Sequence, residues 1–227
     1  LAAIGKGFMS GLDAETEALI CVPATLLSRA SDVLRATSVR LGGQDCHAQG
    51  HGAHTGDISA GMLKDAGAAF VLAGHSERRN DHGESDEAVR AKVLAAWRAG
   101  LCAIICIGET LAQREARETL SVLSRQITGS LPAQATSTNT IIAYEPMWAI
   151  GSGLTPSAKD ITSAHAHIRS ELARHIGDEA GRMRILYGGS VKPENAAELL
   201  ALANVDGALI GGASLKASDF LGIAEAY

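Results

Sequence analysis

Short runs of apolar and β-branched residues alternate along the chain with longer stretches of helical period. The short runs are apolar on both faces, as strands covered by helices must be. This alternation predicts an α/β fold with a parallel sheet and right-handed crossovers. The predicted strands are 18–23, 39–45, 68–74, 102–107, 140–145, 184–189 and 207–211.

Helices are predicted between these strands, and the capping residues agree. Ser85 precedes Asp86 and Glu87 at the start of one helix, and Gly100 ends the same helix. The opening residues, 1–9, have the pattern of the end of a helix with nothing before it. The predicted helical stretches are 85–99, 110–128, 158–175 and 193–202.

Seven strands are visible, whereas a closed α/β barrel has eight. A doubly wound open sheet is the alternative, but no G-x-G-x-x-G motif follows an early strand. We therefore predict an α/β fold of the (β/α)8 TIM-barrel type. Residues 1–227 are expected to form a single domain that lacks its first strand and first loop.

Composition narrows the class of protein. The net charge is −5, there is no basic run, and aromatic residues are 4% of the chain, which argues against nucleic-acid binding. No apolar stretch approaches the ~18 residues of a membrane span, and the start does not resemble a signal peptide. The cysteines fit reduced core residues, so cytoplasm is the expected compartment. They are Cys21, Cys46, Cys102 and Cys106.

Polar residues and glycines gather where the predicted strands end. His75 follows the third strand, and Glu145 ends the fifth, directly before Pro146. Glycine-rich turns, YGGS at 187–190 and IGGAS at 210–214, follow the last two strands. In an α/β barrel these ends share one face, where active sites form, and bare backbone N–H groups there bind phosphate well.

Each of these residues also has an ordinary structural interpretation. A lone histidine is more often a satisfied structural residue, and a buried carboxylate is often paired with an arginine. The shared face favours catalysis instead, with His75 neutral near a helix N-terminus and Glu145 as a base in a dry site. The stretch 148–153 is expected to cover the pocket as a lid. For Glu77, Arg78, Arg79 and Glu109, in contrast, we expect structural ion pairs.

Histidines elsewhere suggest no metal site. His47, His51 and His54 lie near Asp57, but their spacing fits no standard zinc pattern, and the segment is polar and rich in glycine, so a solvated or interfacial loop is expected. His165 and His167 are expected on the surface of the helix that follows the lid.

Six motifs in a fixed order resemble the triosephosphate isomerase family over the whole chain. They are GHSERR (74–79), HGESDE (82–87), CIGE (106–109), AYEPMWAIGSG (143–153), YGGSV (187–191) and DGALIGGASL (206–215).

The resemblance implies interconversion of dihydroxyacetone phosphate and D-glyceraldehyde 3-phosphate without a cofactor. Glu145 would be the base and His75 the electrophile, with Glu77 and Cys106 as supporting residues. The loop 146–156 would close over the site. The implied phosphate-binding residues are Gly151, Ser190, Gly211 and Gly212.

The resemblance also implies a homodimer through the loop 44–59, with Thr55 near its tip. Two features depart from the family pattern. The family carries an Asn-x-Lys on its first strand that has no match here, so the chain as written is expected to be poorly active. Pro156, at the far hinge of the lid, has no N–H to donate to Tyr187.

Other functions fit the sequence less well. A second enzyme alternative is another phosphate-binding barrel, such as an aldolase or a tryptophan-pathway barrel. An aldolase would need a Schiff-base lysine at a strand end, and none of the seven predicted ends carries one. A non-catalytic phosphate-binding barrel, or a truncated inactive isomerase, is the remaining alternative. It would bind anions without turnover.

Overall fold

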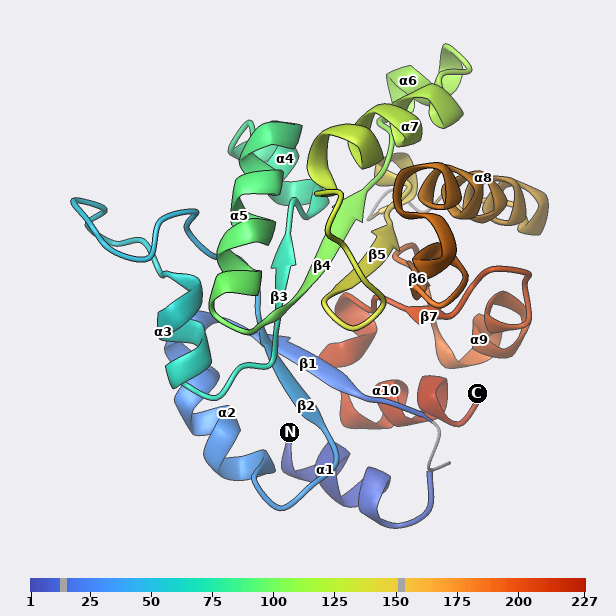
Figure 1. The fold of residues 1–227 in the computed structure, drawn as a ribbon. Coiled ribbons are helices and arrows are strands. Elements are labelled where there is room, and N and C mark those ends of the chain that lie inside the picture. Colours follow the sequence, from blue (N-terminus) through green and yellow to red (C-terminus); the bar gives the residue numbers. More distant parts are fainter. Residues whose placement is uncertain (13–15, 151–153) are drawn as a thin grey trace.

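The computed structural model describes residues 1–12, 16–150 and 154–227. Seven strands form one curled sheet in the order β1 to β7, and all neighbouring pairs are parallel (Figure 1). The seven predicted strands are therefore confirmed. They are β1 (Leu19–Val22), β2 (Arg40–Gly43), β3 (Phe70–Ala73), β4 (Cys102–Ile107), β5 (Thr140–Tyr144), β6 (Ile185–Tyr187) and β7 (Gly207–Ala208).

Helices connect successive strands and cover the outside of the sheet (Figure 1). The α-helices are α1 (Ala2–Met9), α2 (Leu27–Leu34), α3 (Ala60–Asp65), α4 (Ser76–Asp81), α5 (Asp86–Arg98), α6 (Leu111–Glu115), α7 (Thr119–Ser130), α8 (Ala158–Ile176), α9 (Pro193–Leu200) and α10 (Ala217–Ala224). Short 3-10 turns are η1 (Ala24–Leu26), η2 (Met147–Ala149), η3 (Gly177–Gly181) and η4 (Gly212–Leu215).

The prediction of one helix over 110–128 was wrong, because two helices occupy this stretch. The Thr110 hydroxyl accepts from the Gln113 N–H and caps α6, which ends at Glu115. Arg117 then adopts a left-handed backbone with φ 62°, which no α-helix contains, and α7 begins at Thr119.

The strands are apolar on both faces because each face meets a different part of the core. Side chains on the inner face of the curled sheet form one apolar cluster, and those on the outer face pack under the helices. The inner cluster consists of Phe70, Leu72, Ile104, Cys106, Ile141 and Ala143.

The sheet curls until β1 and β7 face one another, but no pairing joins these two strands in the described part of the chain. We call the gap between β1 and β7 the seam. The helical layer continues across it, because the rings of Phe8 in α1 and Phe220 in α10 lie 6.3 Å apart. A cavity of about 1100 Å³ reaches from the carboxyl ends of the strands into the seam. This arrangement is consistent with a (β/α)8 barrel.

His165 is fully buried, so its predicted surface position was wrong. It lies on the inward face of α8, with Tyr144 and Tyr187 5.8 and 6.3 Å from its ring. Its Nδ1 is 2.8 Å from the Asn204 carbonyl, and its Nε2 has no hydrogen-bond partner among the described residues. Burial lowers the pKa of His165 to about 4, so the ring is neutral at physiological pH.

His165 should make the protein less stable as the solution is acidified. The unfolded chain takes up a proton near the ordinary histidine pKa, whereas the folded chain does not until about pH 4. Between about pH 7 and pH 5 this difference removes about 2 kcal/mol of the free energy of unfolding. In His165→Asn the amide still donates to Asn204, and denaturant unfolding at the two pH values should show a loss smaller by that amount. Exposed His82→Asn is the control, and an unchanged pH slope in His165→Asn would contradict the prediction.

All four cysteines are free thiols, as predicted, and Cys46 and Cys106 are buried. Among the helices in the described residues, none is long and apolar enough to cross a membrane.

Candidate active site

Except for the fully buried Cys106, the predicted site residues that the structure describes line one cavity at the carboxyl ends of the strands. His75 and Glu77 follow β3, and Glu145 follows β5. Ser190 follows β6, and Gly211 and Gly212 follow β7; all of these residues line the same cavity. Gly151 lies outside the described residues.

Glu145 is held from both its backbone and its carboxylate, and only 2% of the residue is exposed. Its N–H donates to the Ile107 carbonyl at 2.7 Å, which fixes it to the end of β4. The Ser76 N–H donates to Oε2 at 3.0 Å, and the Ser76 hydroxyl donates to Oε1 at 3.0 Å. His75 Nε2 lies 3.0 Å from the same Oε1. The imidazole and the carboxylate, 70 positions apart in sequence, are therefore in direct contact.

Ser76 was not among the predicted site residues. The only signal for it in the sequence is its place directly after His75 at the start of a helix, where a serine N–H and hydroxyl are both free to donate.

Glu145 controls the protonation of His75 in this arrangement. Burial lowers the pKa of His75, but the hydrogen bond to Glu145 and the negative charges of Glu145 and Glu77 outweigh it, so the pKa is raised. The predicted neutral state of His75 therefore requires the carboxylate to move away from the ring. Glu77 is the weaker influence, since its carboxylate lies 3.8 Å from Nδ1 and is 77% exposed.

Cys106 lies beside the buried carboxylate on the inner face of β4 and is fully buried. Burial, and next the charge of Glu145, raise the pKa of the Cys106 thiol well above its usual value. The thiol therefore stays protonated and is a packing group against Glu145 rather than a nucleophile.

Two glycines are required by the close approach of neighbouring backbone to Glu145. A Cβ at Gly108 would lie 1.7 Å from the Glu145 carbonyl oxygen. A Cβ at Gly188 would lie 2.9 Å from Cγ of Glu145 and 3.1 Å from the Tyr144 carbonyl oxygen. Side chains at either position would displace the carboxylate.

Gly211 and Gly212 differ from these glycines, because a Cβ at either position would meet nothing within 4 Å. Packing therefore does not require glycine there. The Gly211 carbonyl accepts from the N–H and the hydroxyl of Ser214, at 2.9 and 2.7 Å. No hydrogen bond from the N–H of Gly211 or Gly212 to another described residue is found. These N–H groups are available to an anion in the cavity.

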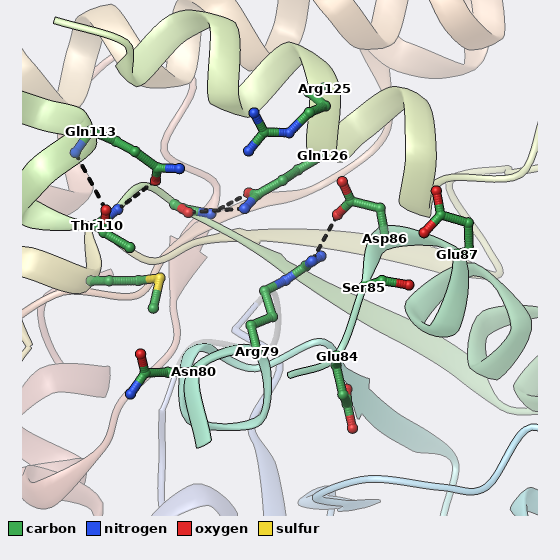
Figure 2. A pocket seen from close by; sticks show the side chains of 12 residues that line it. Arg79, Asn80, Glu84, Ser85, Asp86, Glu87, Thr110, Gln113, Arg125 and Gln126 are labelled. Atoms are coloured by element: carbon green, nitrogen blue, oxygen red, sulfur yellow. Dashed lines mark hydrogen bonds and ion pairs between the residues drawn. The ribbon is translucent and has the colours of Figure 1, made fainter. Parts of the chain in front are cut away.

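Gln126 and Arg79 hold the strand ends beside His75 and Glu145. The Gln126 amide clasps Gly108, accepting from its N–H at 2.7 Å and donating to its carbonyl at 3.1 Å (Figure 2). Arg79 donates from Nε to the carbonyls of Gly74 and Cys106. Its Nη1 pairs with Asp86 at 2.7 Å (Figure 2). Arg79 therefore links the end of β3, which carries His75, to the end of β4, beside Glu145. Both side chains also line a second cavity of about 340 Å³.

The predicted structural ion pairs are partly confirmed. Arg78 pairs with Glu84 at 2.6 Å and Asp45 at 3.0 Å, and Lys92 contacts the same two acids at 2.5 and 2.7 Å. Arg79 pairs with Asp86, as above. The network joins the end of β2 to α4 and α5.

Glu109 makes no ion pair with any described residue, so its predicted pairing was wrong. The carboxylate is fully buried and accepts from neutral donors: Trp148 Nε1 at 2.8 Å, the Tyr144 hydroxyl at 3.2 Å and the Thr119 hydroxyl at 3.3 Å. The Met147 N–H also donates to the Glu109 carbonyl at 3.1 Å. Glu109 therefore anchors the segment that follows the base.

The curled parallel sheet carries a carboxylate, an imidazole and backbone amides that no other described residue pairs with, all at the carboxyl ends of its strands. It defines an enzyme of the α/β-barrel class. Residues 3–227 match the family model described as triosephosphate isomerase. The chain belongs to the triosephosphate isomerase family.

Individual relatives agree with this assignment. A protein from Mesorhizobium japonicum, named triosephosphate isomerase, is 67% identical over 227 residues, which are 100% of this chain and 89% of that protein. A protein from Brucella abortus with the same name is 58% identical over 227 residues, again 100% of this chain and 89% of that protein. The crystal structure of triosephosphate isomerase from Bartonella henselae has a TM-score of 0.92 and 56% identity, covering 99% of this chain and 90% of that one.

Proposed function

We propose that this protein interconverts dihydroxyacetone phosphate and D-glyceraldehyde 3-phosphate through an enediolate, without a cofactor, in glycolysis and gluconeogenesis. The observation that carries the proposal is the 3.0 Å contact between His75 Nε2 and Glu145 Oε1 in a cavity that also contains the amides of Gly211 and Gly212. A base, an electrophile and an anion-binding turn thus reach one three-carbon molecule.

Glu145 takes the proton from the substrate carbon next to the carbonyl, and His75 polarises that carbonyl. For this the carboxylate leaves Ser76 and His75 and turns toward the substrate. The influence of Glu145 that raises the pKa of His75 then weakens, while burial continues to lower it. The ring becomes the neutral hydrogen-bond donor that can move a proton between the two oxygens of the enediolate.

The phosphate of the substrate binds to the N–H groups of Gly151, Ser190, Gly211 and Gly212. Support comes from the amides of Gly211 and Gly212, which no other described residue pairs with, and from two exposed cations, Lys192 and Lys216, that line the same cavity. The segment 146–156 covers the bound substrate and excludes water, which would otherwise favour loss of phosphate from the enediolate.

The complete barrel is proposed to contain one more strand, in the seam between β1 and β7. Two unpaired parallel edges and an apolar inner face meet there, and both are costly to leave in water. The family's Asn-x-Lys would lie on that strand, at the same face as His75.

The protein is further proposed to be a cytoplasmic homodimer joined by the loop 44–59. This loop extends away from the body of the fold ahead of α3 (light blue in Figure 1), and residues 51–58 are exposed. Sedimentation velocity of the full-length protein tests this arrangement, and a monomer at micromolar concentration would contradict it.

A coupled assay with the full-length protein and D-glyceraldehyde 3-phosphate tests the catalytic proposal. Turnover that requires both His75 and Glu145 is expected. The alternative, a non-catalytic phosphate-binding barrel, predicts inorganic phosphate binding by a folded protein with no turnover, and that result would reject the isomerase.

A further inference from the structure

Arg114, in the last turn of α6, contacts two parts of the chain beside the segment proposed to cover the substrate. Its guanidinium carbon lies over the Trp148 ring in η2, 4.0 Å from the ring centre. Its Nη2 lies 3.2 Å from Asp160 Oδ2 in the first turn of α8. We call η2 and this first turn the two anchors of the segment 146–156, because one lies at its start and the other directly after it. One side chain thus joins both anchors.

The backbone of α6 holds Arg114 independently of these contacts. Thr110 and Gln113 form a capping box, with the Thr110 N–H donating to the Gln113 side chain at 2.9 Å. The Arg114 N–H donates to the Thr110 carbonyl at 3.0 Å. Beyond the break at Arg117, the Glu118 N–H donates to the Gln113 carbonyl at 2.8 Å. Both ends of this short helix are therefore fixed, and Arg114 extends from a defined position.

The first anchor is held at the edge and at a face of Trp148. At the edge, Nε1 donates to the buried Glu109 carboxylate at 2.8 Å. At the face, the planar guanidinium of Arg114 is attracted by the negative charge above the ring, and this attraction is stronger where water is excluded. Trp148 is 8% exposed and the Arg114 side chain 33%. The contact with Glu109 sets the position of the ring, and the contact with Arg114 sets its tilt.

The second anchor depends on the carboxylate that Arg114 contacts. Asp160 Oδ2 accepts from the N–H of Ser157 at 3.1 Å and from its hydroxyl at 2.8 Å, which closes the capping box at the start of α8. Burial raises the pKa of Asp160, but the hydrogen bonds from Ser157 and the charge of Arg114 outweigh it, so the pKa is lowered. The ion pair is therefore charged at physiological pH. One oxygen links Arg114 to Ser157, the residue directly after Pro156.

We propose that Arg114 is a positioning residue for the isomerisation, which ties both anchors to α6 so that the segment between them covers the substrate in one orientation. This inference rests on the proposed function. A segment whose ends are already fixed has fewer conformations to lose when it covers the substrate, so ordering it costs less free energy. Without Arg114 the covered complex is less populated, and water reaches the enediolate more often.

A purely structural role for Arg114 predicts a different result. If the side chain only joined α6 to α8, its loss would lower stability and leave the course of the reaction unchanged. The fate of the enediolate separates the two roles. In water its electron pair expels phosphate as the C–O bond breaks, which leaves inorganic phosphate and a three-carbon enol that becomes methylglyoxal. The phosphate released per molecule of isomer formed therefore measures how well the substrate is covered.

Steady-state kinetics and phosphate release of the full-length protein test the proposal. In Arg114→Gln, kcat/KM should fall about tenfold and phosphate release per isomer should rise by a similar factor, as expected from the loss of one stacked guanidinium and one partly exposed ion pair. Asp160→Asn keeps an acceptor for Ser157 but removes the charge, and should show a smaller change in the same direction. Arg174→Gln is the matched control, because this exposed arginine of α8 pairs only within its own helix, with Glu171, among the described residues.

Hydrogen exchange of the substrate-free protein gives a second readout that requires no turnover. The amides of Ala149, Ile150 and Ile161 are hydrogen-bonded within the anchors and should exchange about tenfold faster in Arg114→Gln, but not in Arg174→Gln. Normal exchange in Arg114→Gln, or a loss of stability with unchanged phosphate release per isomer, would overturn the inference alone. Absence of turnover by the unsubstituted protein would reject the proposed function, and with it the role of Arg114 in isomerisation.

Discussion

Glu145→Asp should lower kcat for triose phosphate isomerisation by about a hundredfold to a thousandfold, with little change in KM. The shorter side chain withdraws the carboxylate by one carbon–carbon bond from the substrate carbon. The charge, the neighbouring strands and the phosphate-binding turns all remain. Because proton abstraction depends steeply on the distance between base and carbon, the loss falls on the chemical step rather than on binding.

Steady-state kinetics of the full-length protein in both directions measure this effect. Glu115→Asp, an equally conservative change at an exposed position of α6, is the matched control and should leave kcat unchanged. A Glu145→Asp protein with near-normal kcat would remove Glu145 from the role of base.

Gly108→Ala should be the most damaging single-methyl change near the site. The new Cβ would lie 1.7 Å from the Glu145 carbonyl oxygen, far inside contact distance, so the ends of β4 and β5 would have to separate. Separation breaks the Glu145 to Ile107 hydrogen bond and disturbs both bonds between Gly108 and Gln126. We expect a loss of about 3 kcal/mol in the free energy of unfolding and a large fall in kcat.

The matched control is Gly181→Ala in η3, where a Cβ meets nothing within 4 Å and φ is not positive. Denaturant unfolding and kcat should be measured for both variants. Equal stability of the two would show that the strand ends yield easily, contrary to the close fit of Gly108 against Glu145.

The sequence alone was sufficient to predict the strands of the sheet and the two principal site residues, His75 and Glu145. Strands covered on both faces leave continuous apolar runs, and parallel strands bring their carboxyl ends together, so His75 and Glu145 could be assigned to one face. The partners of these residues could not be assigned. The hydrogen bonds from Ser76 and the clasp by Gln126 depend on contacts between separate elements, which no local pattern records.

His165 and Arg117 show two different reasons for the errors. His165 lies at helical spacing from the buried residues Ile161, Ile168 and Leu172, so this spacing indicated that His165 is buried. The prediction of a surface position gave more weight to the polarity of histidine. The break at Arg117 has no glycine or proline to announce it, and a left-handed arginine is stabilised only by the surrounding fold.

The seam between β1 and β7 links closure of the barrel to the strength of the base. The cavity that holds Glu145 continues into this seam, where the proposed additional strand would lie, so that strand would keep water from reaching the carboxylate through the inner side of the barrel. A hydrated carboxylate is a weaker base than a dry one. Proton abstraction in this protein therefore depends on how tightly the barrel is sealed at its interior, and substitutions that loosen α1 against α10 should slow catalysis from a distance.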